Sequence, residues 1–305
     1  MRVLFIGATK FGERCLHRCL QMQNYIEIVG IVTLREYFNI SYARDKGVRN
    51  YRYADFFIDS ALRDIPKHIL RGKMSDHEVV SFCERLEPEF IIVAGWYHMI
   101  PKIIRNIPRL GTAGFHASLL PYYRGGAPLV WAIINGETET GVSFFYFEDG
   151  VDEGDLIAQE SVDIAYEDDI ASLYAKVEEK SLKIISTTLP LITRGQNQRI
   201  KQKELPQDIK AKWPNRSPED GLIDWNQPAK RIYDFVRAQT HPYPGAFTID
   251  SNTGRKLTIW KSEVVDIAKR DKVFPGKILT RDENNRYLFS TNENDKAILV
   301  TCVSS

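Results

Sequence analysis

The sequence predicts an α/β fold: a mostly parallel, Rossmann-like sheet with helices on both faces, followed by a small, mostly β domain of the OB-like barrel kind. Two observations predict it. Short apolar runs alternate with helical segments as far as residue 193, as in repeated β–α units. After a polar stretch over 194–215, short β-branched and aromatic runs follow, separated by turn residues. We therefore expect a larger domain at 1–193, a linker at 194–215 and a β-rich domain at 216–305.

The first domain opens with a β–α–β unit. Val3–Ala8 is a continuous apolar run that predicts a buried strand, Lys10–Gln23 is expected to form a helix, and Ile26–Thr33 predicts a second strand. The turn Gly7–Gly12 lacks the second glycine of a dinucleotide-binding loop and the lysine that follows the glycines of a P-loop. We interpret it as a tight strand-to-helix turn.

The alternation of strands and helices continues to residue 190. Two further helices and four strands are expected, the helices at Glu78–Leu86 and Ala127–Ile134 and the strands at Phe90–Ala94, Thr112–His116, Gly141–Phe147 and Leu156–Ile164. A longer helix is predicted to begin at Asp168 or Asp169, either of which is a good cap. Pro190 is expected to end it, because proline lacks the N–H that a helix interior needs.

The predicted linker differs in composition from its surroundings. It carries six basic and two acidic residues between Arg194 and Lys212, and Pro206 and Pro214 lie in it. Beyond it we expect one helix at Ala229–Gln239. Short strands are predicted at Ala246–Asp250, Lys256–Lys261, Arg286–Ser290 and Ala297–Val303.

Composition excludes several classes of protein. The 305 residues include 41 Lys and Arg against 40 Asp and Glu, so the net charge of +1 provides no overall field to attract nucleic acid. No apolar run approaches the roughly 20 residues that span a bilayer, and the first run is too short for a signal peptide. We expect no membrane association and a cytoplasmic location. The four cysteines lack CxxC spacing, which favours buried thiols over disulfides or a metal site.

The segment from Gly114 to Trp131 concentrates residues with catalytic potential. It places His116 at the end of a strand, followed by a loop rich in proline and glycine that carries Ser118 and Arg124. Catalytic groups in open α/β sheets gather at the carboxyl ends of strands, and imidazole is the side chain that titrates nearest neutrality. His116 is therefore a candidate proton acceptor, with a purely structural histidine as the alternative.

A second cluster places four acidic residues in the loop Glu148–Ile157, between two predicted strands. Gly150 and Gly154 permit a sharp turn in this loop. The spacing does not fit a calcium-binding loop, and no second ligand cluster accompanies it, so a metal site is disfavoured. We expect one of these carboxylates to lie near His116 and orient it.

Together these residues resemble the formyltransferases that take their one-carbon unit from N10-formyltetrahydrofolate. The shared pattern runs from His116 to Asp155 and reads His-x-Ser-Leu-Leu-Pro-x-x-Arg-Gly, Ala-Pro with Trp, Asn-Gly-Glu-x-x-x-Gly-Val, and Gly-x-Asp-x-Gly-Asp. Asn215–Trp225, Val236–Ala238 and Pro242–Phe247 are similar to the second domain of the branch that formylates nucleotide-linked amino sugars, especially the UDP-4-amino sugars of lipid A modification. The resemblance covers most of the chain.

The resemblance implies that His116 and Asp152 are catalytic. The third catalytic residue of the family, an asparagine two positions before the histidine, falls on Gly114, so the chain departs from the pattern there. In the family this amide donates to the formyl oxygen as it gains negative charge, and losing such a donor costs about 10²–10³ in rate. We expect a water molecule or protonated His116 to replace it, or turnover to be slow.

The resemblance also implies where ligands bind. The cosubstrate N10-formyltetrahydrofolate is expected along the loop that follows Phe90–Ala94, at Gly95, Trp96 and Tyr97, and also at Asp149 of the acidic loop. The nucleotide sugar is expected at Ser118, Arg124, Arg216 and Tyr243, with the Arg124 guanidinium offering two hydrogen bonds to the diphosphate. The family implies a homodimer and no metal.

The predicted function is therefore transfer of a formyl group to the primary amine of a nucleotide-linked amino sugar, with a UDP-linked 4-amino-4,6-dideoxy hexose favoured, for surface-glycan synthesis. Three alternatives stay open. A methionyl-tRNA formyltransferase shares the catalytic segment, although the charge balance argues against tRNA. Gly114 also allows a non-catalytic binder of folate or nucleotide sugar. A formyltetrahydrofolate hydrolase is the third.

Overall fold

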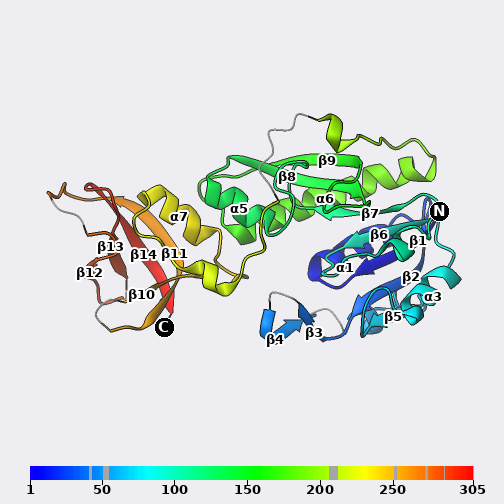
Figure 1. Cartoon of the computed structure of the whole chain (residues 1–305), viewed down its shortest axis with the longest axis horizontal. Coiled ribbons are helices and arrows are strands. Elements are labelled where there is room, and N and C mark those ends of the chain that lie inside the picture. The colour runs from blue at the N-terminus through cyan, green and yellow to red at the C-terminus, as the bar shows by residue number, and fades with distance from the viewer. Residues whose placement is uncertain are drawn as a thin grey trace. The chain divides into compact units, whose positions relative to one another are not determined.

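A computed structural model describes residues 1–40, 43–50, 55–205, 212–250, 253–271, 274–284 and 286–304. The chain forms two compact units (Figure 1). The first comprises Met1–Gly125, Gly141–Val162 and Val177–Lys212, and the second comprises Gly126–Thr140, Asp163–Lys176 and Trp213–Ser305. Residues 206–211 of the predicted linker lie outside the described part of the chain.

The first unit is built on a seven-stranded sheet in the order β5-β2-β1-β6-β7-β8-β9. The pairs that join β5, β2, β1, β6 and β7 are parallel, whereas β8 runs antiparallel to β7. The predicted α/β class is therefore confirmed. The strands are β1 (Arg2–Gly7), β2 (Glu27–Leu34), β5 (Lys67–Leu70), β6 (Phe90–Ala94), β7 (Thr112–His116), β8 (Glu139–Tyr146) and β9 (Leu156–Asp163), and β3 (Tyr37–Ile40) pairs separately with β4 (Ala43–Arg49).

Helices cover both faces of this sheet because the strand order reverses at β1. The helices of residues 1–125 are α1 (Lys10–Leu20), α2 (Asp55–Ile58), α3 (His77–Arg85) and α4 (Lys102–Arg105), whereas α5 (Pro128–Asn135) belongs to the second unit. α1 leads from β1 to β2 on one side, and α3 leads from β5 to β6 on the other. Right-handed crossovers in opposite directions place their helices on opposite faces. Leu4 and Ile6 accordingly share a core cluster with Val79 and Phe82 of α3. The reversal between β1 and β6 is where open sheets of this kind bind ligands.

The turn between β1 and α1 is tight, as predicted. The hydroxyl oxygen of Thr9 accepts a hydrogen bond from the Gly12 amide at 3.2 Å and so caps α1. A Cβ atom at position 12 would lie 2.5 Å from the carbonyl oxygen of Ala94, at the end of β6. Glycine is needed there because the helix starts against the neighbouring strand.

The long helix α6 (Ile170–Thr193) corrects one prediction, because Pro190 lies inside it rather than ending it. A proline inside a helix removes one backbone hydrogen bond and crowds the carbonyl four residues before it. Leu189 and Ile192 on either side of it are 0% and 1% exposed, so packing of the last turn offsets that loss. The helix begins as expected, with the Asp169 carboxylate accepting from the backbone N–H of Ser172 at 2.9 Å. No helix in the described ranges is long and apolar enough to cross a membrane.

The second unit contains a five-stranded antiparallel sheet in the order β10-β11-β14-β13-β12. Its strands are β10 (Ala246–Ile249), β11 (Lys256–Asp266), β12 (Ile278–Arg281), β13 (Tyr287–Ser290) and β14 (Lys296–Ser304), and its helices include α7 (Ala229–Arg237) and the short 3₁₀ helix η2 (Pro218–Gly221). Ile232 of α7 packs with Trp225, Ile259 and Phe289 in one apolar core. The mostly β second domain is therefore confirmed.

A buried ionic network fastens α7 within the second unit. The Asp234 side chain is 1% exposed and accepts hydrogen bonds from Lys230 Nζ and from Arg237 Nε, at 2.6 and 2.8 Å. Arg237 also donates to the carbonyl oxygens of Ala165 and Asp168, at 3.0 and 2.5 Å. One guanidinium thus joins α7 to the segment that precedes α6.

Acid is expected to weaken this unit through Asp168. Burial by itself raises the pKa of Asp168, but hydrogen bonds from Lys176, the Ala165 amide and Ser172 outweigh it and hold the pKa below its ordinary value. A carboxyl group with a depressed pKa stabilises the fold above its unfolded pKa, and this stability is lost as pH falls through the folded pKa. Between about pH 7 and about pH 3, the urea midpoint of unfolding should therefore fall by a smaller amount in Asp168→Asn than in the parent. An equal fall in both proteins would contradict this.

Candidate active site

His116 and Asp152 lie together in the first unit, as the sequence analysis expects. His116 is the last residue of β7, and Asp152 lies in the acidic loop between β8 and β9. The Nδ1 atom of His116 is 3.6 Å from Oδ2 of Asp152, and the two side chains are 9% and 20% exposed. An imidazole and a carboxylate from separate loops therefore face each other at the carboxyl end of a central strand.

The loop that follows β7 fixes the orientation of the imidazole. Nε2 of His116 lies 2.8 Å from the carbonyl oxygen of Tyr123. Because a carbonyl only accepts, Nε2 must carry the proton, which leaves Nδ1 as the nitrogen that can take one. The Gly125 amide donates to Oδ2 of Asp152 at 2.9 Å. The same loop therefore holds both members of the pair.

The backbone at Gly114 explains why this chain lacks a side chain there. A Cβ atom at position 114 would lie 2.6 Å from Cζ of Phe147 and 2.8 Å from the carbonyl oxygen of Val93, on the paired strand β6. The Phe147 ring thus fills the space that a side chain at position 114 would enter, two residues from His116. Phe147 is not predictable as a site residue from the sequence, because nothing in the apolar strand pattern around it indicates which neighbour the ring contacts.

Gly114→Asn is expected to lower the free energy of unfolding by about 1–3 kcal/mol, the usual cost of overpacking. The Phe147 ring can move, but the Val93 carbonyl belongs to the sheet and cannot. Adding Phe147→Ala should therefore recover only part of the loss. Urea unfolding of the parent, the single variant and the double variant measures this. A single variant as stable as the parent would show that position 114 has room.

The four predicted folate residues lie in two segments. Gly95, Trp96 and Tyr97 follow β6, and Trp96 packs against the core beside α3. Within the described part of the chain, the buried Nε1 of Trp96 has no hydrogen-bond partner. Asp149 lies in the acidic loop, where its carboxylate pairs with Arg105 of α4.

The predicted substrate residues of the first unit are both engaged by the protein. The Ser118 side chain is buried, and its hydroxyl donates to the carbonyl oxygen of Tyr122 at 2.6 Å. The Nε and Nη2 atoms of Arg124 donate to Oε1 of Gln202, at 3.2 and 2.7 Å. The edge of Arg124 that suits a diphosphate is therefore already occupied.

The other two predicted substrate residues belong to the second unit and have partners there. Nη2 of Arg216 donates to Oε1 of Gln239 at 2.7 Å, and its guanidinium lies over the ring of Trp131, 4.8 Å from the centroid. Burial lowers the pKa of Arg216. The hydroxyl of Tyr243 lies 3.0 Å from that of Tyr174. Both residues help to build this unit.

The first two cysteines of the chain belong to the core. Cys15 and Cys19 of α1 are fully buried, and burial raises the pKa of Cys19 to about 12, so its thiol stays protonated at neutral pH. In the parts of the chain that the structure covers, no group of three or more His, Cys, Asp or Glu side chains is placed to hold a metal ion.

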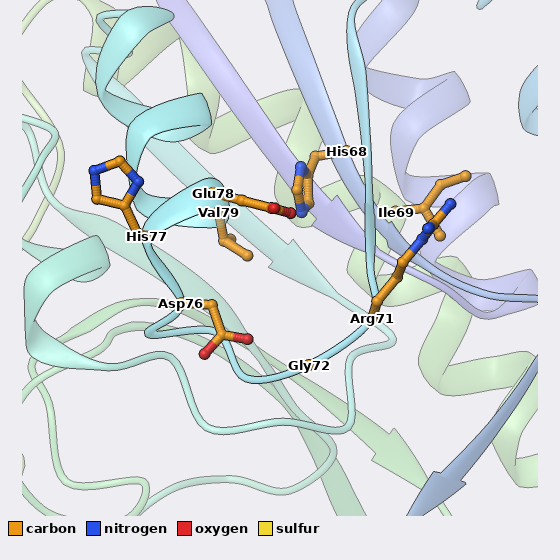
Figure 2. Close-up of a pocket in the computed structure, with 8 residues that line it drawn as sticks. All are labelled: His68, Ile69, Arg71, Gly72, Asp76, His77, Glu78 and Val79. Carbon is orange, nitrogen blue, oxygen red and sulfur yellow. The ribbon is translucent and has the colours of Figure 1, made fainter.

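A cavity of about 320 Å³ lies away from this site, between the end of β5 and the start of α3 (Figure 2). Its lining includes His68, Arg71 and Asp76, and the Glu78 carboxylate points toward the His68 ring. Burial lowers the pKa of His68. Three strands, β2, β1 and β6, separate β5 from β7 in the sheet, so this cavity is distinct from the His116 site.

The chain is similar to known proteins over almost its whole length. Residues 1–189 match the family described as "Formyl transferase", and residues 215–304 match "Formyl transferase, C-terminal domain". The methionyl-tRNA formyltransferase of Halalkalibacterium halodurans is 34% identical over 304 residues, covering 99% of this chain and 89% of that protein. The bifunctional polymyxin resistance protein ArnA of Wigglesworthia glossinidia brevipalpis is 38% identical over 199 residues, covering 65% of this chain and 29% of that protein.

Solved structures share the fold. WlaRD, a sugar 3N-formyltransferase crystallised in the presence of dTDP and 5-N-formyl-THF, superimposes with a TM-score of 0.64 at 17% identity, covering 98% of this chain and 97% of that one. HypX from Aquifex aeolicus, in complex with tetrahydrofolic acid, gives a TM-score of 0.63 at 19% identity, covering 99% of this chain and 44% of HypX. With both family domains matched and a histidine–aspartate pair at the end of β7, the chain belongs to the formyltransferase family.

Proposed function

We propose that this chain transfers a formyl group from N10-formyltetrahydrofolate to the primary amine of a nucleotide-linked amino sugar. The observation that carries the proposal is the separation of 3.6 Å between Nδ1 of His116 and Oδ2 of Asp152. The pair provides a proton acceptor and a carboxylate that orients it, which formyl transfer to an amine requires. A UDP-linked 4-amino-4,6-dideoxy hexose remains the favoured acceptor.

In the proposed reaction the substrate amine attacks the formyl carbon and loses a proton. His116 takes that proton at Nδ1, because Nε2 is committed to the Tyr123 carbonyl. Asp152 stabilises the imidazolium that forms, and the Gly125 amide keeps its carboxylate in place. The bond from the formyl carbon to the folate nitrogen then breaks, the imidazolium of His116 returns its proton to that nitrogen, and tetrahydrofolate leaves.

The oxygen of the formyl group must be stabilised without the family's asparagine. The Phe147 ring occupies the space next to Gly114, which disfavours a water molecule there. We therefore assign this role to the Nδ1–H that His116 gains with the amine proton; this donor is absent when the amine attacks, so the rate is lower than with a preorganised donor, which is worth about 10²–10³.

Two observations support folate as the formyl donor. Trp96, at the end of β6, keeps a buried Nε1–H for which no acceptor exists among the described residues. A bound ring system with a carbonyl or ring nitrogen would satisfy it. WlaRD, which shares the fold, was crystallised with 5-N-formyl-THF. Gly95, Trp96, Tyr97 and Asp149 are the residues that we assign to this ligand.

The charge of the second unit supports a small acceptor over tRNA. Residues 213–305 contain 14 Lys and Arg against 12 Asp and Glu. Several of these cations pair with carboxylates, as Lys230 and Arg237 do with Asp234 and Lys296 does with Asp266. The net charge of these residues is therefore only +2, a small excess for the phosphate contacts that dominate affinity for nucleic acid.

A panel of UDP-linked and dTDP-linked amino sugars, incubated with N10-formyltetrahydrofolate, tests the proposal. One member is expected to gain the mass of a single CO unit while tetrahydrofolate is released. Calorimetric binding of both ligands without tetrahydrofolate release would instead show a non-catalytic binder. Release of tetrahydrofolate with no acceptor present would show a hydrolase.

Methionyl-tRNA formyltransferase is the second candidate, because relatives of that name match almost the whole chain. It predicts tight retention of tRNA on filters, with affinity falling steeply as salt rises. We expect weak retention with little salt dependence.

The proposal also includes the homodimer and the cytoplasmic location that are expected from the family. Sedimentation of the purified protein tests whether it is a dimer.

A further inference from the structure

A buried glutamine outside the motif lies beside the catalytic pair. Gln202 belongs to the short 3₁₀ helix η1 (Gln202–Glu204), in the stretch that the sequence analysis interprets as a linker. Its side chain is 1% exposed, whereas Gln198 nearby is exposed. An amide is buried at this depth only when its polar atoms have partners.

The partners of Gln202 are the two loops that hold the catalytic pair. Its Nε2 donates to the carbonyl oxygens of Asp152 and Gly154, at 3.0 and 2.7 Å. Its Oε1 accepts from Nε and Nη2 of Arg124. Carbonyls only accept and guanidinium only donates, so these four contacts allow a single orientation of the amide.

The residues around Gln202 reinforce this attachment. Leu156 and Ile200 exchange backbone hydrogen bonds in both directions, at 2.8 and 2.9 Å. The Arg199 guanidinium lies 3.3 Å from both the Asp155 and the Glu148 carboxylates. Residues 199–202 therefore run along the acidic loop and are fastened to it at several points.

We propose that Gln202 is a positioning residue that sets the Asp152 carboxylate against His116. One side of its amide holds the backbone of Asp152. The other side holds Arg124, whose neighbour Gly125 donates to the Asp152 carboxylate at 2.9 Å. A single side chain thus fixes both the donor and the acceptor of that hydrogen bond, and with it the distance from the carboxylate to the imidazole.

This role assigns Arg124 a task different from phosphate binding. The Nε–Nη2 edge of its guanidinium donates to Gln202, so Arg124 holds the loop that follows β7 in place. A diphosphate would have to compete with a buried amide for that edge.

Kinetics of three variants test the proposal. Gln202→Ala removes all four contacts, and Gln202→Glu keeps the size and the contact to Arg124 but loses both donors to the acidic loop. Both are expected to lower kcat by about 100-fold, the effect of misplacing a catalytic group by about 1 Å. KM should stay within about threefold, because no substrate contact is removed. Gln198→Ala is the matched control and should behave as the parent. Parental kcat in Gln202→Glu would overturn the proposal.

The kinetic test rests on the proposed function. A second measurement tests the role of Gln202 without depending on that function. Amide hydrogen exchange should become about threefold faster or more in peptides over 121–126 and 148–156 of Gln202→Ala, and not in Gln198→Ala. Unchanged exchange in Gln202→Ala would overturn the role of Gln202 in holding the loops. Faster exchange with unchanged kcat would overturn its role in positioning the pair. Faster exchange in a protein whose parent transfers no formyl group would leave the loop contact intact and reject the proposed function instead.

Discussion

Replacing His116 with glutamine is expected to lower kcat by about 10²–10⁴-fold, the usual contribution of a general base. The glutamine amide can still donate to the Tyr123 carbonyl, as Nε2 of the imidazole does at 2.8 Å. It cannot take a proton from the substrate amine. The fold should therefore survive while chemistry fails, and release of tetrahydrofolate under saturating substrates is the measurement.

Two further variants make this result specific. Asp152→Asn removes the charge that faces Nδ1 and should also lower kcat, without a large change in KM. His77→Gln alters an exposed histidine at the start of α3, on the wall of the cavity in Figure 2, and should leave kcat unchanged. A His116→Gln enzyme with parental turnover would remove the imidazole from the mechanism.

Replacing Asp234 with alanine is expected to cost about 3–5 kcal/mol of stability, the effect of breaking a buried ion pair from one side. The Arg237 side chain, 8% exposed, would keep its charge in an apolar setting without its carboxylate partner. The Ala165 and Asp168 carbonyls that also bind it carry no charge to replace the one lost.

Urea unfolding followed by tryptophan fluorescence measures this loss, since four of the five tryptophans lie in the second unit. Asp266→Ala is a suitable control, because the Asp266–Lys296 pair is on the surface, with the Asp266 side chain 87% exposed, and its removal should leave the midpoint unchanged. A loss of less than about 1 kcal/mol in Asp234→Ala would show that the network adds little to stability.

Strands whose burial is set by local pattern could be predicted from the sequence. Phe90–Ala94 and Thr112–His116 were placed to the residue, because continuous apolar runs between turn residues have few alternatives. β5 (Lys67–Leu70) was missed. It is only four residues long, lies at the sheet edge and begins with Lys and His, so it lacks the apolar signal of a central strand.

The site was predictable where it follows a motif and unpredictable where it depends on tertiary contacts. His116 and Asp152 are predicted from the resemblance and lie 3.6 Å apart, and their catalytic role stays a prediction. Gln202 could not be singled out, because Gln196, Gln198 and Gln202 occur in one polar run and only the last is buried. A polar side chain becomes buried because of partners that lie far away in sequence, here Arg124 at a separation of 78 residues.

The glycine–phenylalanine contact beside His116 has a consequence for redesign of the site. An asparagine at position 114 would sit without strain only if the Phe147 ring and the Val93 carbonyl both moved away. A further hydrogen-bond donor intended to raise the rate is therefore better introduced from another loop than from strand β7.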